Sequence, residues 1–107
     1  MNLPFPIQTY FDADRRSDGA ALVHAFSPDA VVTDEGQTHA GRQAIDAWWR
    51  GGKTRYQHVI EPLEAAGQGD VRNVRARVTG QFPGSPAVLT FAFRLEGDQI
   101  TGLEVGA

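Results

Sequence analysis

Hydrophobic positions in the first half of the chain recur every three or four residues, the period of a helix with one buried face. A first helix is predicted behind two early prolines, because a proline costs nothing where the helical N–H has no partner. Its apolar stripe contains Ile7, Tyr10 and Phe11, and Asp14 falls on the same stripe. A second helix is predicted over 19–26, and the Ser-Pro-Asp sequence that follows breaks it.

A short apolar strand is expected at 30–32, and an acidic segment follows it at once. Alternation along this strand puts Asp34 on the same side as the core residue Val32 and sends Glu35 to the opposite face. A third helix is predicted from Gly41, with two adjacent tryptophans on or beside its buried face. The glycine pair at 51–52 is expected to end it.

From residue 56 onward the hydrophobic period changes to two, which indicates strands. The segment 56–66 predicts a long strand that Pro62 interrupts with a bend, a bulge or an edge position. Two further strands alternate clearly, and a tight Gly-Asp turn at 97–98 joins the second of them to a last strand. Helices followed by hairpin-linked strands predict an α+β fold in which three helices cover one face of a curved, mainly antiparallel sheet. The open end of such a cone is a natural ligand cavity.

Length and composition narrow the function classes. The 107 residues predict one domain, 1–107, and the net charge of −3 argues against a nucleic-acid partner. The chain has no cysteine, so thiol nucleophiles and zinc–thiolate sites are excluded, and no pair of histidines has metal-ligand spacing. No motif indicates a nucleotide or another cofactor. No apolar run reaches the length of a membrane span, so no membrane partner and a cytoplasmic location are expected.

The element order and two segments of sequence resemble the nuclear transport factor 2-like superfamily, in particular its SnoaL-like and ketosteroid isomerase-like branch. The segments are IQTYFDADRRSDGAALVHAFSPDAVVTDEG and HAGRQAIDAWW. In steroid isomerases of this branch, a tyrosine of the first helix donates a hydrogen bond to the substrate oxyanion, and an aspartate at the end of the first strand is the general base. Those positions fall on Tyr10 and Asp34. The resemblance also implies a cone-shaped fold and a homodimer formed through the sheet face.

One position departs from the isomerase pattern. The second oxyanion donor of that branch is a protonated aspartate on a late strand, and Phe91 stands at its position. Loss of one such donor typically costs about 100- to 1,000-fold in rate. The resemblance therefore predicts a SnoaL-like protein without steroid isomerase activity.

Three residues are the catalytic candidates. Asp34 is the candidate base, since desolvation beside an apolar strand makes a carboxylate a better proton acceptor; the alternative is a solvated turn residue. Tyr10 either donates to a substrate oxygen or packs in the core with its hydroxyl bonded to a backbone carbonyl or to Asp14. His58, expected inside a strand with Tyr56 and Ile60 facing inward, either polarises a bound oxygen or is a satisfied core histidine.

Four further residues are candidates for substrate binding: Asp14, His39, Trp48 and Phe91. A helix cap or a surface position is the simpler interpretation of Asp14. His39 is expected to bond Asp34 or to anchor the loop before the third helix. Only one of Trp48 and its neighbour is expected to form a wall of the cavity.

Two function hypotheses remain open from the sequence. The first is a cofactor-free isomerase, cyclase or dehydratase that uses a carboxylate base on a small apolar carbonyl compound. The second is a non-catalytic ligand-binding or dimerisation module with the same pocket, which Phe91 favours. The arginines at 75 and 77 are expected on the sheet surface, where they could also meet acidic residues of a second copy.

Overall fold

Three helices and six strands make up the computed structural model, which describes residues 1–107. In chain order they are α1 (Phe5–Arg16), α2 (Gly19–His24), β1 (Phe26–Asp34), β2 (Gln37–Ala40), α3 (Arg42–Tyr56), β3 (Val59–Ala66), β4 (Val71–Thr79), β5 (Ala87–Glu96) and β6 (Gln99–Gly106). No helix combines the length and the apolar character that a membrane crossing requires.

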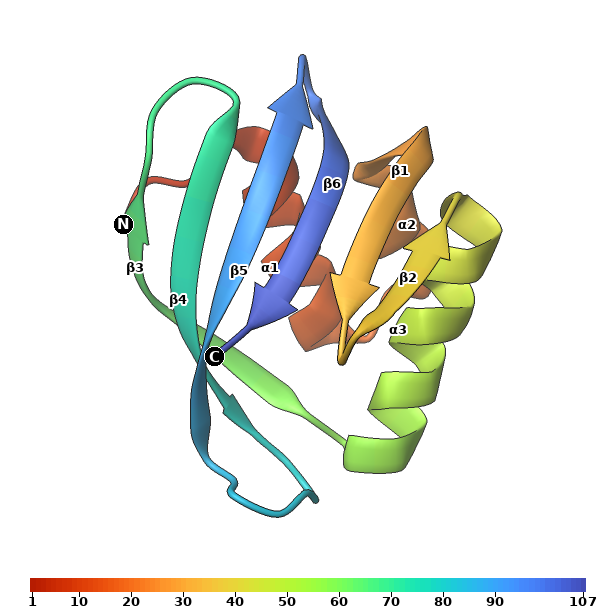
Figure 1. Ribbon diagram of the computed structural model, residues 1–107, viewed down its shortest axis with the longest axis vertical. Helices are drawn as coiled ribbons and strands as arrows, with labels where there is room; N and C mark the ends of the chain where they lie inside the picture. The colour runs from red at the N-terminus through yellow and green to blue at the C-terminus, as the bar shows by residue number, and fades with distance from the viewer.

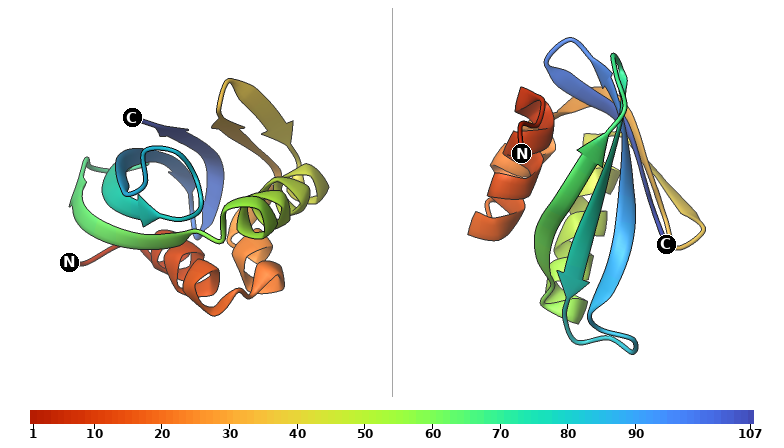
Figure 2. Two further views of the ribbon diagram at one scale, coloured as in Figure 1. Left: turned by 90° about the horizontal axis from the view of Figure 1, so that it is seen from below. Right: turned by 90° about the vertical axis from the view of Figure 1, so that its left-hand side faces the viewer.

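The strands form one sheet in the order β2-β1-β6-β5-β4-β3. Only the β1–β6 pair is parallel, so the sheet is mainly antiparallel, as the sequence predicts. Figure 1 shows the sheet in front with the helices behind it. In the end-on view of Figure 2 the sheet curls strongly on the side of β3 and β4, and the helices lie along its concave face. The predicted α+β architecture is confirmed.

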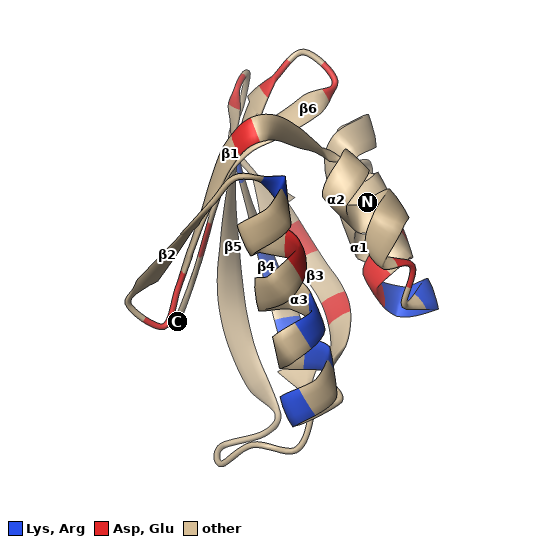
Figure 3. Cartoon of the chain, turned by 90° about the vertical axis from the view of Figure 1, so that its right-hand side faces the viewer, with Lys and Arg blue, Asp and Glu red and all other residues tan.

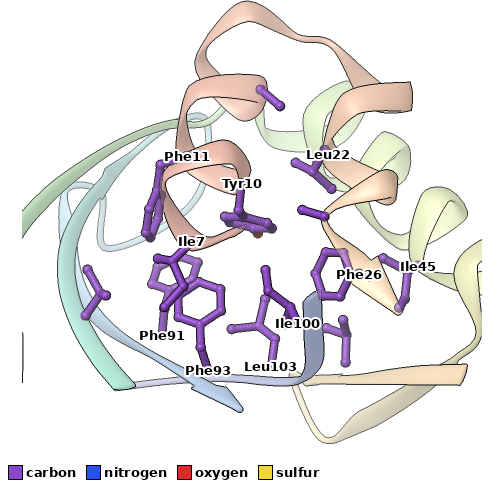
Figure 4. Close-up of a cluster of buried hydrophobic side chains, with 14 of the residues drawn as sticks. Ile7, Tyr10, Phe11, Leu22, Phe26, Ile45, Phe91, Phe93, Ile100 and Leu103 are labelled. Carbon is purple, nitrogen blue, oxygen red and sulfur yellow. The ribbon is translucent and has the colours of Figure 1, made fainter. Parts of the chain in front are cut away.

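The core lies between the inward side chains of the sheet and the apolar stripe of α1 (Figure 4). The alternation predicted for β4 and β5 is present: Val74, Ala76, Phe91 and Phe93 are all buried. Tyr10 packs edge-on against Phe11, Phe26 and Phe93, with ring centroids 5.2–5.9 Å apart. Edge-to-face packing of this kind stabilises a core beyond the area it buries.

The acidic segment after the first strand is part of a hairpin, not a loop leading to a helix. Glu35 and Gly36 form its turn with φ of 52° and 75°. Positive φ at both central positions gives the turn the twist that a two-residue hairpin needs. The second strand of this hairpin, β2, pairs His39 with Val32 and was not expected from the sequence.

Two element boundaries also differ from the prediction. Strand β1 begins at Phe26 and continues through the Ser-Pro-Asp sequence, with an irregularity before Val31. Helix α3 continues through both of its glycines to Tyr56 and ends where Gln57 takes a left-handed conformation, φ 50°. Glycine inside a helix costs about 1 kcal/mol, an amount that packing of the helix on the sheet can offset. Of the alternatives predicted for Pro62, two are present: the β3–β4 register shifts between Pro62 and Glu64, and β3 is an edge strand of the sheet.

Candidate active site

A cavity of about 440 Å³ opens between α1, α3 and the concave face of the sheet, a volume within the usual range for small-molecule sites. Ten of the 15 residues that line it are hydrophobic. Its aromatic members are Tyr10, Trp48, Trp49, Tyr56, Phe82 and Phe91, and its titratable members are Tyr10, Asp34, Glu35, Tyr56 and His58. No lysine or arginine lines it, so the fixed charges that face a ligand there are carboxylates.

Asp34 is the last residue of β1 and lines the cavity in a half-buried position. Its Oδ2 accepts a hydrogen bond of 2.9 Å from the indole N–H of Trp48, on α3. An N–H donor from a ring that is itself packed against the core holds the carboxylate in one orientation. Asp34 therefore meets the geometric requirement for a base: it reaches the cavity and is fixed there.

Tyr10 lines the same cavity from α1, although only 1% of the residue is exposed. Its hydroxyl has no hydrogen-bond partner in the protein, and no fully enclosed side-chain oxygen or nitrogen lacks one. The hydroxyl must therefore open into the cavity. Burial, then the negative charges of Asp14 and Asp34, raise the pKa of Tyr10 well above 10.0, so the side chain remains a hydrogen-bond donor.

Asp14 is not a cap or a surface residue, contrary to the simpler interpretation of the sequence. It is 1% exposed, and its Oδ1 lies 2.8 Å from the indole nitrogen of Trp49 and 2.8 Å from Nε2 of His58. Lys53 Nζ lies 3.5 Å from Oδ2. Asp14 does not line the cavity itself, but it is hydrogen-bonded to His58, which does. It is thus a buried anion with three polar partners.

The ionisation of Asp14 follows from these partners. Burial alone would raise the pKa of the carboxyl group. The hydrogen bonds from His58 and Trp49, with the positive charges of His58 and Lys53, outweigh burial and lower the pKa of Asp14 below its usual 3.8. Asp14 is therefore a carboxylate at neutral pH, and it can only accept hydrogen bonds.

His58 lies in the connection between α3 and β3, not inside a strand as expected, because α3 continues to Tyr56. It lines the cavity nevertheless. Its backbone carbonyl accepts a hydrogen bond of 2.8 Å from Lys53, the same lysine that approaches Asp14. Lys53 thereby fixes both members of the Asp14–His58 pair.

The two tryptophans both line the cavity, so the expectation that only one would do so is wrong. Adjacent positions on a helix point about 100° apart, and each indole binds a different carboxylate: Trp48 binds Asp34, and Trp49 binds Asp14. Phe91 forms an apolar part of the wall, where its ring lies 6.3 Å from that of Tyr10.

Two residues near the mouth of the cavity differ from their predicted positions. His39 lies on β2, where its ring is 6.1 Å from the Trp48 ring; it neither lines the cavity nor bonds Asp34. Glu35 lines the cavity, although strand alternation predicts it on the opposite face of the sheet. Its positive φ in the turn ends the alternation, and the Tyr56 hydroxyl donates to it over 3.5 Å.

The burial of Asp14 could be predicted from the sequence, because the residue falls on the buried stripe of α1. The partners of Asp14 could not be predicted, because Trp49 and His58 are 35 and 44 positions away in the sequence. No three or more histidine, aspartate or glutamate side chains of the protein are arranged to hold a metal ion. The cavity thus brings together two carboxylates, two phenols and one imidazole around an apolar space, and the buried Asp14 bonds the imidazole from outside the lining.

Comparison with known protein families identifies the family of this chain. The model of the SnoaL-like domain matches residues 7–103. The chain belongs to the SnoaL-like family. A "putative polyketide cyclase" from Sinorhizobium meliloti is similar over 96% of this chain and 94% of its own, with 48% sequence identity and a TM-score of 0.94.

Other solved structures are less similar in sequence to this SnoaL-like protein and share only its fold. A hypothetical protein with a ketosteroid isomerase-like fold from Catenulispora acidiphila, in complex with trimethylamine, is 21% identical with a TM-score of 0.86, over 99% of this chain and 87% of its own. A protein of the nuclear transport factor 2-like fold from Cytophaga hutchinsonii is 11% identical with a TM-score of 0.79, over 94% and 84% of the two chains. No curated protein matches the chain.

Proposed function

We propose that this SnoaL-like protein is a cofactor-free enzyme that moves a proton on an apolar carbonyl compound bound in the cavity. The observation that supports the proposal most is that an oriented carboxylate, Asp34, and a phenol without a partner in the protein, Tyr10, line one apolar space. A base and an oxygen-binding donor that face one cavity are the two groups that enolisation needs.

In the proposed step, the Asp34 carboxylate takes a proton from the carbon next to the carbonyl group. The C–H electron pair becomes the double bond of the enolate, and the negative charge moves to the carbonyl oxygen. Tyr10 stabilises that charge by donating its hydroxyl proton in a hydrogen bond. Return of the proton from Asp34 to another carbon completes an isomerisation. In a ring closure, the enolate carbon attacks a second carbonyl carbon of the same molecule, and the oxygen of that carbonyl group takes the proton from Asp34.

The lining favours an uncharged substrate of polyketide type. Carboxylates at Asp34 and Glu35, with no lysine or arginine in the lining, repel an anionic ligand, and ten hydrophobic residues favour an apolar one. The 48% identical protein, whose name is "putative polyketide cyclase", supports a substrate with several carbonyl groups.

The competing function is ligand binding without turnover. Phe91 favours it, because the position where a second oxyanion donor would stand is apolar and buried. The same cavity would then bind the same class of molecule. The two functions differ only in whether Asp34 exchanges a proton with the ligand.

We also propose that the protein is a homodimer joined through the outer face of the sheet. That face carries exposed valines at 31, 71 and 88 and a shallow hollow of about 330 Å³ over β1, β6 and β5. Arg75 and Arg77 are paired with Glu64 and Glu61 of the same chain, so they do not require acidic residues of a second copy. Paired charges leave the apolar part of the face free for association.

Proton abstraction can be tested without knowing the natural substrate. A panel of apolar enolisable ketones, such as β-tetralone and cyclic diketones, is incubated with the protein in deuterated water, and loss of the α-proton signal is followed by NMR. We expect the wild type to accelerate exchange for at least one ketone. Asp34→Asn is expected to abolish the acceleration, and Tyr10→Phe to reduce it by about 100-fold or more, as loss of one oxyanion donor does.

Asp46→Asn is the matched control, because Asp46 is a carboxylate on the outer side of α3 that pairs with Arg50. It is expected to exchange protons at the wild-type rate. Tight binding of ketones by a wild type that never accelerates exchange would replace the enzyme proposal with the ligand-binding one.

A further inference from the structure

The Asp14–His58 pair is the most enclosed ion pair of the protein and has no part in the step proposed for Asp34. The Asp14 side chain is 2% exposed and that of His58 is 14% exposed. A buried ion pair contributes little net stability compared with well-packed apolar residues of the same size. The fold alone therefore gives no reason for a carboxylate at position 14, and the neighbouring cavity offers one.

The hydrogen bond between the two residues fixes which histidine nitrogen carries the proton. Asp14 is a carboxylate, which can only accept, so Nε2 of His58 must be the donor across the 2.8 Å contact. Nδ1 is then the nitrogen left for other chemistry. It has no partner in the protein and is not fully enclosed, since no enclosed side-chain nitrogen lacks a partner.

The surroundings of the ring indicate where Nδ1 points. His58 and Gly52 both line the cavity. A Cβ atom placed on Gly52 would lie 3.8 Å from Cε1 and 3.9 Å from Nδ1 of His58. The edge of the ring that carries Nδ1 therefore lies beside the part of α3 that borders the cavity, where the absent side chain of Gly52 leaves it open to a ligand.

We propose that His58 is the second proton-transfer group of the cavity, acting through Nδ1 on a ligand oxygen, and that Asp14 is its positioning residue. The proposal rests on the proposed function, because it supplies the acid for the reaction in which Asp34 is the base. It also accounts for Phe91: the second group that acts on the ligand oxygen comes from the α3–β3 connection instead of from β5.

The chemistry balances in one step. Asp34 takes the proton from carbon, the C–H electron pair forms the carbon–carbon double bond, and the carbonyl oxygen takes the Nδ1 proton of the His58 imidazolium ion. The ketone becomes a neutral enol, Asp34 becomes a carboxylic acid and His58 becomes a neutral imidazole. Because Asp14 remains negative throughout, it stabilises the imidazolium ion before the step and holds the ring in place after it.

The first test is ¹⁵N NMR of the histidine side chains, which are only three in number and can be assigned by substitution. In the neutral ring of His58 we expect the proton on Nε2 and none on Nδ1. Saturation with β-naphthol, an uncharged enol analogue, is expected to shift the Nδ1 resonance of His58 and to leave His24, on the surface, unchanged. A neutral His58 ring with its proton on Nδ1 instead of Nε2, or an Nδ1 resonance that naphthol does not move, would overturn the proposal.

The second test is His58→Gln, because a glutamine amide can keep the donor to Asp14 while it removes Nδ1. We expect α-proton exchange to fall by about 100-fold or more, the usual contribution of a general acid or base, with the midpoint of urea unfolding unchanged. His24→Gln is the control and is expected to exchange at the wild-type rate. Exchange by His58→Gln within about tenfold of wild type would contradict the role of Nδ1.

The two proposals fail separately. If Asp34→Asn exchanges protons as fast as wild type, the function proposed for Asp34 is wrong whatever the spectrum of His58 shows. If Asp34→Asn loses exchange while His58→Gln keeps it, only the role of His58 is wrong. If no ketone is exchanged, the response of Nδ1 to naphthol decides alone whether His58 acts on a ligand oxygen.

Discussion

The indole nitrogen of Trp49 lies 2.8 Å from Oδ1 of Asp14, and this contact joins α3 to α1 through the interior of the protein. Neighbouring Trp48 makes the equivalent contact with Asp34, at the end of β1. Two consecutive side chains of one helix thus each orient one carboxylate, in directions about 100° apart. Figure 3 shows that basic residues gather on the C-terminal half of α3, the half from which Lys53 reaches Asp14.

Replacing Asp14 by alanine is expected to destabilise the protein strongly. The change leaves the Trp49 indole, His58 and Lys53 without their common partner, and breaking a buried charged pair in this way costs about 3–5 kcal/mol. Asp12→Ala, on the same helix, removes a largely exposed pair with Arg15 and a hydrogen bond from Gln8, and should cost only about 1 kcal/mol. Urea unfolding of the two variants measures the difference, and equal costs would contradict the buried role of Asp14.

The ionisation of Tyr10 gives a prediction at alkaline pH. Its pKa is well above 10.0 in the folded protein, so above pH 10 the unfolded chain loses this proton first, and stability should fall as pH rises further. The protein has only two tyrosines, and in a Tyr56→Phe background the ultraviolet absorbance of phenolate reports Tyr10 alone. Adding Asp34→Asn should lower the pKa of Tyr10, since it removes one of the charges that raise it. Titration of Tyr10 at its ordinary value in the folded protein would show that the hydroxyl is not in an apolar, negatively charged site.

The two adjacent glycines of α3 allow a matched test of which part of the helix borders the bound ligand. Gly51→Ala and Gly52→Ala should both stabilise the helix by roughly 0.5–1 kcal/mol. A methyl group at Gly51 meets nothing, whereas one at Gly52 enters the cavity wall 3.9 Å from Nδ1 of His58. Only Gly52→Ala is therefore expected to weaken binding of β-naphthol, which can be followed by quenching of tryptophan fluorescence. Equal binding by both variants would place the ligand elsewhere.

Association through the sheet can be tested at Ala92, a half-buried residue near the centre of the outer face. Sedimentation velocity is expected to give a dimer for the wild type and a monomer for Ala92→Glu, because one new charge per chain would be buried without a partner. A monomeric wild type, or a dimer that Ala92→Glu does not affect, would contradict this interface.

Strands β4 and β5 could be predicted because each has one face in the core. Alternation of Val74, Ala76 and Val78 with arginines leaves little choice of face or register. Strand β2 could not be predicted, because all four of its residues are at least partly exposed and carry no alternating pattern. The sequence predicts too early an end for α3, because tertiary packing outweighs the local cost of its two glycines.

Only those parts of the site that a local sequence pattern or the family resemblance indicates could be predicted. Asp34 and Tyr10 reach one cavity as the resemblance implies. The network around Asp14 depends on contacts between α1, α3 and the connection after α3, and a sequence contains no local signal for the partners that a buried carboxylate will have. Glu35 reached the cavity through the turn geometry of a hairpin that was itself not expected.

The most direct test of the central claim is the rate at which Asp34→Asn exchanges the α-proton of a ketone that the wild type exchanges, measured in deuterated water at saturating ketone. The substitution keeps the size of the side chain and its contact with Trp48 but removes the base. We predict a loss of at least about 100-fold, the lower range for removal of a general base. A rate for Asp34→Asn equal to that of the wild type would contradict the claim that Asp34 takes the proton.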